Sequence, residues 1–307
     1  MPNLDRIIPM VKQPYGLHWL KLWLACAPRF WSLVVDLRRS AFAYTVIARR
    51  RRIVGRSHEG VHKLRQLADT LGLAEAPAPH LWTGPAHDAA AARLVPKAGG
   101  PVLAIGPTAN WRGKQWRGER FAALAERLTA PDGPVPGARI AVLAAAHERA
   151  QAAPLLAATP ASRLVDLVGR TDLLTAASVL RRAAMFIGND TGLMHIAAAA
   201  GTPTLGLFGP SPIAQYAPWG SATAFVRTTQ PPEEMFGPGF DHRLTDTLMD
   251  SLSVEMAAAA ARDLWHRVQS DVPSVIPGRR NAANPEPIFQ RPMFMGSGFA
   301  AEGRTPE

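Results

Sequence analysis

The residues that could do chemistry gather in two short polar segments, each directly after an apolar run. In the first, three residues of helix-capping types, Asn189, Asp190 and Thr191, follow the apolar run 185–188. A helix of small residues should begin at Gly192. Free N–H groups at a helix N-terminus can hold a phosphate. The carboxylate of Asp190 is suited to accept hydrogen bonds from sugar hydroxyls. This segment therefore predicts a site for a phosphorylated sugar.

The second segment, 106–116, follows the apolar run 102–105 and contains Thr108, Asn110 and Lys114. Its small residues would let backbone N–H groups approach a phosphate, its hydroxyl could donate a hydrogen bond, and its ammonium could neutralise charge. The spacing differs from that of a P-loop. The pattern alone makes this segment a plausible phosphate cradle, and a solvated loop is the alternative.

Apolar runs alternate with helix-like segments along most of the chain, which predicts an α/β fold with parallel sheets. Strands are expected at 31–37, 52–55, 102–105, 139–143, 164–167, 185–188, 204–208 and 222–226. Helices are expected at 17–27, up to Ala48, and at 61–72, 118–128, 175–183, 192–200 and 253–268. Capping signals should bound several of these helices: Thr171 or Thr175 and Ser253 at starts, and Gly72 and Gly201 at ends.

The length of 307 residues suits two domains of ordinary size. Residues 73–100 are rich in Ala and Pro, and we interpret them as the end of one domain and the linker to the next. This divides the chain into an N-terminal domain with linker at 1–93 and a C-terminal domain at 94–269. Beyond it, Pro, Gly, Asn and Arg replace periodic apolar residues, which indicates a flexible tail at 270–307.

The charge balance favours an acidic partner. There are 34 Lys and Arg against 24 Asp and Glu, a formal net charge of +10. Much of the excess is arginine scattered through Ala-rich helices, for which biased arginine usage is an equal explanation. The run 49–52 is four arginines, and we favour the positive last turn of a helix over a contact with anionic lipid. Nucleic acid is disfavoured because no basic and aromatic stripe is present.

The composition also bears on the cellular compartment of the protein and on whether it binds a metal. A single cysteine, Cys26, cannot form an internal disulfide, and this favours the cytoplasm. Lys21 interrupts the apolar stretch 17–27, so we expect an amphipathic helix there, with Leu17, Leu20, Leu24 and Ala27 on one face, and not an export signal. His58 and His62 lie four residues apart without a third ligand, so no metal is expected, nor any cofactor.

The residues around the first polar segment resemble glycosyltransferase family 9, which contains the heptosyltransferases of lipopolysaccharide core synthesis. The resemblance is carried by Asp190 to Ala199 (DTGLMHIAAA), Gly201 to Thr204 (GTPT) and Leu207 to Ser211 (LFGPS). It implies a GT-B-like fold of two Rossmann-like, doubly wound parallel-sheet domains, the N-terminal one incomplete here. It further implies inverting transfer of a sugar from a nucleotide diphosphate, with ADP-heptose favoured, to lipopolysaccharide core or another surface glycan.

The family's site residues can be carried over at matching positions. Lys114 would contact the diphosphate, with Thr108 and Asn110 as hydrogen-bonding neighbours. Glu148 would bind the ribose, although alanines replace the family's glycines before it. At the first segment the resemblance implies that the donor sugar and its phosphates are held by Asp190, Thr191, Gly192 and His195.

The general base of the family is an Asp in a loop after the first strand, and we find no counterpart. Asp36 is the nearest substitute. We therefore expect either that translation starts further upstream or that the chain lacks its base.

A non-catalytic nucleotide-sugar-binding protein is the alternative function. A sugar-nucleotide epimerase is a third, against which the 190–210 pattern speaks. A phosphorylated glycolipid acceptor would place the protein at the inner face of the inner membrane, in peripheral contact with anionic lipid.

Overall fold

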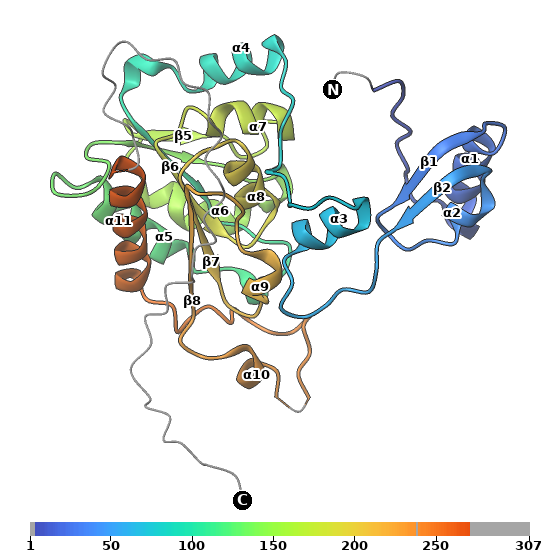
Figure 1. The fold of residues 1–307 in the computed structure, drawn as a ribbon. Coiled ribbons are helices and arrows are strands. Elements are labelled where there is room, and N and C mark those ends of the chain that lie inside the picture. The colour runs from blue at the N-terminus through green and yellow to red at the C-terminus, as the bar shows by residue number, and fades with distance from the viewer. Residues whose placement is uncertain (1–3, 238, 271–307) are drawn as a thin grey trace, which may run out of the picture. The chain divides into compact units, whose positions relative to one another are not determined.

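The computed structural model describes residues 4–237 and 239–270, and its largest feature is a six-stranded parallel sheet (Figure 1). The strand order is β5-β4-β3-β6-β7-β8. Counted along the chain from β3, this is 3-2-1-4-5-6, the order of a Rossmann fold. The strands are β3 (Val102–Gly106), β4 (Arg139–Val142), β5 (Leu164–Asp166), β6 (Met185–Asn189), β7 (Thr204–Phe208) and β8 (Thr223–Arg227).

Helices pack on both faces of this sheet, so its strands are apolar on both sides. Leu103 and Ile105 of β3 join a core under three helices, and Val102 and Ala104 join a second core under three others. The first three helices are α5 (Gly118–Thr129), α6 (Arg149–Ala158) and α11 (Val254–Ser270). The others are α4 (Pro85–Leu94), α7 (Leu173–Leu180) and α8 (Gly192–Ala199).

A second, two-stranded parallel sheet is formed near the N-terminus, where β1 pairs with β2. Very little of this region is enclosed, because Asp36, Ala43 and Val46 are the buried residues within 4–60. The N-terminal elements are η1 (Pro14–Gly16), α1 (Leu17–Cys26), β1 (Trp31–Asp36), α2 (Phe42–Thr45), β2 (Ala48–Ile53) and α3 (Lys63–Leu71). The remaining short helices are η2 (Lys97–Gly99), η3 (Arg112–Lys114), η4 (Ala146–Glu148), α9 (Ile213–Tyr216) and α10 (Pro232–Met235).

Several predicted helix ends are confirmed. Gly72 and Gly201 follow their helices with φ of 70° and 79°, the left-handed conformation that a side chain disfavours. After α8, the N–H of Thr202 donates to the carbonyl of Ala197, which closes a Schellman motif. At the start of α11, the Ser253 hydroxyl accepts a hydrogen bond from Met256 N–H.

Other local predictions were wrong. The four arginines at 49–52 lie in strand β2 and not in the last turn of a helix, because the preceding helix α2 ends at Thr45. The strand predicted at 52–55 therefore begins earlier, at Ala48. The cap of α7 is neither of the two predicted threonines but Asp172, whose carboxylate accepts from Thr175 N–H at 2.7 Å.

The segment 73–100 contains α4, a helix that the sequence did not indicate. Ala91 of this helix and the following Val95 are buried in the same core as α7. Side chains add to that contact, since Ser178 donates to Asp88 at 2.6 Å. Residues 73–100 are thus partly helical. Apart from Ser270, which ends α11, the predicted tail at 270–307 lies outside the described residues.

In the part of the chain that the structure describes, no helix is both long and apolar enough to cross a bilayer. Among the same residues, no three His, Cys, Asp or Glu side chains lie where they could hold a metal ion together. His62 instead caps α3. Its Nδ1 accepts from Leu64 N–H at 3.2 Å, and its Nε2 donates to the Ala217 carbonyl at 2.9 Å.

We expect the His62 ring to make stability depend on pH. Burial lowers the pKa of His62 below 6.5, although the hydrogen bond to Ala217 raises it. Protonating Nδ1 would also remove the acceptor for Leu64 N–H. The folded state therefore binds fewer protons than the unfolded state as the pH falls below about 6.5. The thermal midpoint should decrease through that range, and less steeply in His62→Gln. The control His266→Gln changes an exposed histidine, and its thermal midpoint should depend on pH as steeply as that of the wild type. The same pH dependence in all three proteins would show that His62 is not the group responsible.

Candidate functional site

The two polar segments singled out in the sequence meet at the carboxyl ends of β3 and β6. These strands are neighbours in register, with Gly106 opposite Gly188. The chain leaves them in opposite directions along the sheet, so this is the switch point at which open α/β sheets bind ligands. Lys114 Nζ donates to Asp190 Oδ2 across it at 2.8 Å. The side chains are 27% and 7% exposed, so the ion pair is largely shielded from water.

Asn189, at the end of β6, holds the two loops together. Its side chain is fully buried, with Oδ1 accepting from Trp116 N–H at 3.1 Å and Nδ2 donating to the Pro107 carbonyl at 3.0 Å. The amide thus satisfies backbone groups of the loop after β3, which would otherwise be buried without partners. Sequence reasoning treated Asn189 as a capping residue type and missed this role. A polar residue ending an otherwise apolar strand was the available signal.

Helix α8 begins beside the ion pair. Its N-cap, Thr191, makes no side-chain capping bond, so the first N–H groups of the helix are not satisfied by their own cap. A Cβ built on Gly192 would meet nothing within 4 Å, so that position faces open space. His195 follows one turn later, with Nε2 3.9 Å from Asp190 Oδ1. Burial lowers the pKa of His195, while Asp190 raises it and Lys114 and His62 lower it.

The loop after β4 completes the predicted set. Thr108 Oγ1 donates to Glu148 Oε2 at 2.9 Å, and the same oxygen accepts from Ala145 N–H at 2.9 Å. Asn110, in contrast, is exposed. Its neighbour Ala109 is held through an N–H bond to Gln151 Oε1. The structure therefore brings Thr108 and Glu148 together, and Lys114 with Asp190, while Asn110 stands at the outside of the loop.

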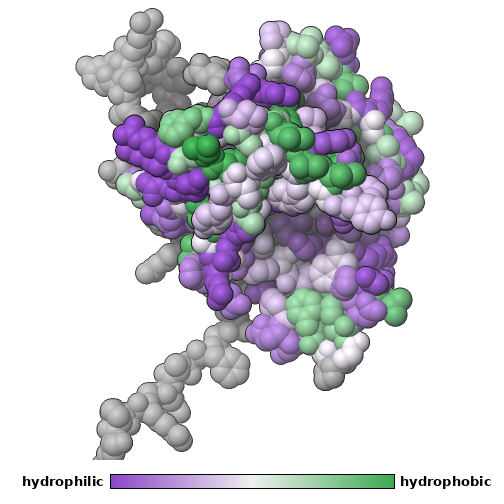
Figure 2. Space-filling view, turned by 90° about the vertical axis from the view of Figure 1, so that its right-hand side faces the viewer, coloured by the Kyte–Doolittle hydropathy of each residue, from purple (hydrophilic) through white to green (hydrophobic). Residues whose placement is uncertain are grey.

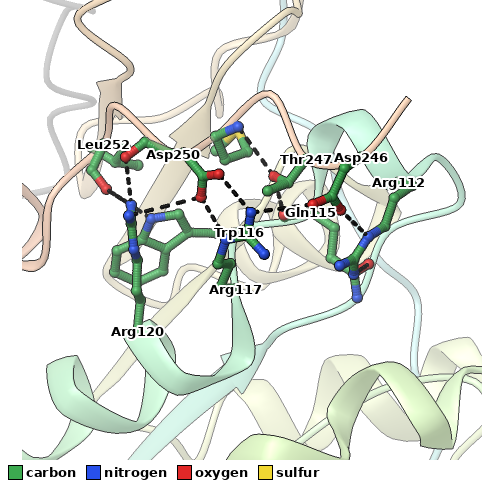
Figure 3. A network of polar contacts seen from close by, with 10 residues as sticks. Arg112, Gln115, Trp116, Arg117, Arg120, Asp246, Thr247, Asp250 and Leu252 are labelled. Atoms are coloured by element: carbon green, nitrogen blue, oxygen red, sulfur yellow. Dashed lines mark hydrogen bonds and ion pairs between the residues drawn. The ribbon is translucent and has the colours of Figure 1, made fainter. Parts of the chain in front are cut away.

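An arginine and aspartate network fastens the outer part of the β3 loop and the start of α5 to residues 246–252 (Figure 3). Arg117 contacts both Asp246, at 3.1 Å, and Asp250, at 2.6 Å, and these carboxylates raise its pKa. Isolated surface ion pairs contribute little, but a connected set holds its members in place. Further hydrogen bonds join the same segments, among them Arg112 to Asp246, Arg120 to the Leu252 carbonyl and Trp116 Nε1 to that carbonyl.

Asp36 ends β1 and is buried in the turn that follows. Its carboxylate accepts from Arg38 N–H at 2.8 Å, Ser40 N–H at 2.7 Å and the Ser40 hydroxyl at 2.8 Å. Burial raises the pKa of Asp36, but these hydrogen bonds outweigh it and leave the pKa below 3.8. Such a carboxylate has little tendency to take a proton near neutral pH. The predicted role of Asp36 as a substitute base stays a prediction.

The chain is similar to known proteins over much of its length. The model of glycosyltransferase family 9 (heptosyltransferase) matches residues 36–237, about two thirds of the chain. Lipooligosaccharide heptosyltransferase 2 of Haemophilus influenzae is 32% identical over 123 residues, which cover 38% of this chain and 34% of that protein. Lipopolysaccharide heptosyltransferase 2 of Salmonella typhimurium is 29% identical over 115 residues, 36% of this chain and 32% of that protein. The matches thus span about a third of these relatives.

Solved structures share the fold over more of the chain. A family 9 glycosyltransferase from Veillonella parvula superposes with a TM-score of 0.67 at 17% identity, over 87% of this chain and 84% of that one. ADP-heptose lipopolysaccharide heptosyltransferase II of E. coli superposes with a TM-score of 0.60 at 17% identity, over 78% of this chain and 77% of that one. These likenesses confirm the predicted α/β, GT-B-like fold class.

Replacing Asn189 should test how the two loops are held. Asn189→Ala would leave Trp116 N–H buried without its acceptor, and we expect a loss of about 1–3 kcal/mol in the free energy of unfolding. Asn110→Ala removes the same side chain at an exposed position and should change it by less than about 0.5 kcal/mol. Urea unfolding measures both. Equal effects of the two substitutions would contradict the positioning role of Asn189.

Proposed function

The chain belongs to glycosyltransferase family 9, and from that premise we propose that it transfers heptose from ADP-heptose to a hydroxyl of lipopolysaccharide core or another surface glycan. The proposed reaction inverts the anomeric centre and needs no metal. The acceptor would be a phosphorylated glycolipid. Relatives named as heptosyltransferases support the donor sugar, and a structural neighbour, E. coli heptosyltransferase WaaC, was solved with ADP.

The pairing of Lys114 with Asp190 at the switch point is the observation that carries this proposal. The two side chains present opposite charges at one point, as a ligand with both phosphates and hydroxyls requires. On binding, a donor phosphate would take hydrogen bonds from Lys114, and a sugar hydroxyl would donate to Asp190. The donor would thereby exchange one protein ion pair for two ligand contacts, so neither the buried Asp190 nor the half-buried Lys114 would be left unpaired.

Catalysis would follow from stabilising the departing diphosphate. Negative charge develops on it as the bond to the anomeric carbon breaks. Lys114 and the N–H groups at the start of α8, those of the N-cap Thr191 and of Gly192, would be aimed at that charge before reaction begins. His195 would serve as a further neutral contact to phosphate or sugar, since burial lowers its pKa. The acceptor oxygen would bond to the anomeric carbon from the opposite face of the sugar as the bond to the diphosphate breaks, which produces inversion. The proton of the acceptor hydroxyl would pass to a general base.

The nucleoside would lie toward β4. Both hydrogen bonds that Glu148 accepts within the described chain go to Oε2, and its other oxygen could accept from the ribose. Thr108 would fix the carboxylate in that orientation. Asn110, exposed at the outside of the loop, is the weakest member of the proposed set, and we assign it at most a contact at the edge of the diphosphate.

A second candidate function, binding of the nucleotide sugar without transfer, is favoured by the surroundings of Asp36. Three hydrogen bonds already occupy its carboxylate, and its pKa is low, so it is a poor base for the acceptor hydroxyl. The two functions predict different outcomes with ADP-heptose and a heptose-free lipopolysaccharide acceptor. Transfer releases ADP in proportion to the modified acceptor, whereas binding alone releases none.

Calorimetric titration with ADP, UDP, GDP and ADP-heptose tests the donor site directly. We expect selectivity for one nucleotide, so that ADP and ADP-heptose bind more tightly than UDP and GDP. Lys114→Ala should lose about 1.5–3 kcal/mol, which is about ten- to a hundredfold in affinity, because a charge-assisted contact is removed.

The matched control is Lys97→Ala, which removes an exposed lysine that precedes β3, at the other end of the sheet. It should bind the donor like the wild type. Equal binding of all four ligands, or an unchanged affinity in Lys114→Ala, would refute the donor site.

A further inference from the structure

Three aromatic side chains form a cluster beside the loop that carries Lys114. Trp111 belongs to that loop, and Phe236 and Phe240 lie after α10 in the segment that follows β8. The rings of Trp111 and Phe236 are nearly parallel, with 15° between their planes and 6.5 Å between their centroids. Phe240 stands edge-on to both, at 89° and 83°. Because Phe236 is 43% exposed, the cluster presents a flat ring to solvent.

The cluster is attached directly to the candidate donor site. Lys114 N–H donates to the Trp111 carbonyl at 3.1 Å, so the two residues share one turn of η3. The indole N–H of Trp111 donates to the His242 carbonyl at 2.7 Å. A Cβ built on Gly113 would come within 2.6 Å of the Trp111 ring, so this ring lies on the backbone of the loop itself. The aromatic rings are therefore fixed close to Lys114.

The topology of the sheet places the cluster on the side of Lys114 that faces away from the proposed nucleoside position. That position lies toward β4, on one side of β3, whereas β6, β7 and β8 lie on the other side. The segment after β8 reaches the β3 loop from this second side. On the face seen in Figure 2, hydrophobic groups gather near the lower end, at the height that α10 has in Figure 1. The cluster therefore flanks the sugar end of the donor site and not the nucleoside end.

Charge and chemistry around the rings favour a neutral sugar as the ligand. Residues 229–247 contain four Asp or Glu and one Arg, so a phosphate or an acidic sugar would meet charge of its own sign. Glu233 and Glu234 are exposed just before Phe236, and Asn110 is exposed next to Trp111. Carboxylate and amide groups can accept hydrogen bonds from sugar hydroxyls. The C–H face of a sugar ring can pack on an aromatic face, whose quadrupole is negative.

We propose that Trp111 and Phe236 form a stacking platform for a neutral sugar ring of the acceptor glycan. The sugar of the donor is assigned to Asp190, toward which the Lys114 side chain points. The indole of Trp111 instead reaches the exposed segment at His242, so the platform lies on the outer part of the same loop. Identification of the bound glycan as the acceptor rests on the proposed function, whereas binding of the sugar ring can be measured without it.

Saturation-transfer NMR of the full chain with methyl heptopyranoside, a neutral probe, tests the platform. Phe236→Ala should weaken binding about three- to tenfold, because the exposed ring is lost. Phe236→Tyr keeps the ring and should bind like the wild type. Phe236→Leu keeps apolar bulk without a flat face and should lose as much affinity as alanine. The matched control is Leu244→Ala, which truncates a side chain of the same segment that is 85% exposed and should leave binding unchanged.

Two further measurements separate the platform from the donor site. The probe could also occupy the position of the donor sugar, in which case Asp190→Asn would weaken its binding and Phe236→Ala would not. We expect the reverse. Calorimetry with ADP should give the wild-type affinity in Phe236→Ala, because the platform lies away from the nucleotide. Trp111 is left in place throughout, since its ring and carbonyl shape the loop of Lys114.

The proposal would be overturned by a wild-type protein that does not bind the heptoside, by unchanged binding in Phe236→Ala or by full affinity in Phe236→Leu. An equal loss of ADP and heptoside affinity in Phe236→Ala would also overturn it, because the ring would then only support the loop. Failure of the donor site gives a different result. A chain that binds the heptoside through Phe236 but does not bind ADP would refute the donor site and leave the sugar platform standing.

Discussion

The parallel pairing of β3 with β6 is the contact on which the candidate site depends. The chain moves from β3 toward one edge of the sheet and from β6 toward the other, so the connections after these strands diverge. In open α/β sheets, ligands bind in the crevice outside the carboxyl ends of the strands at such a point. Two residues 76 positions apart, Lys114 and Asp190, come within 2.8 Å there because their strands are neighbours in register.

The loop after β3 has no sheet partners along most of its length, and other contacts hold it in place. Asn189 accepts a hydrogen bond from the backbone of this loop on its buried side, and Gln151 of α6 accepts another. The segment with Asp246 and Asp250 holds the outer part of the loop through ion pairs. Each contact comes from a different part of the chain. Positioning of this kind holds the Lys114 side chain beside Asp190, so a ligand at this point would find the ammonium group already ordered.

The two sheets differ in how much they enclose. Strands of the larger sheet bury side chains on both faces, which requires the apolar runs that made them recognisable. Strand β2 pairs with β1 but carries four consecutive arginines, and both strands present exposed side chains. A sheet that encloses so little leaves apolar and charged groups at its surface together, and this combination gives the N-terminal region its distinct chemistry.

Local pattern by itself determined the alternation of elements, the larger sheet's strands and the glycine helix ends. It also marked the segments holding Lys114 and Asp190, since period and capping are properties of neighbouring residues. It mispredicted the arginine run, because pairing with β1 makes β2 a strand despite its polarity. Helix α4 was missed because its burial against α7 is a tertiary contact. The Lys114–Asp190 pair, the buried amide of Asn189 and the contact of Trp111 with Phe236 were decided by the tertiary structure alone. Each depends on which residues from distant parts of the chain lie next to it in space, and the spacing of residues along the chain does not determine that.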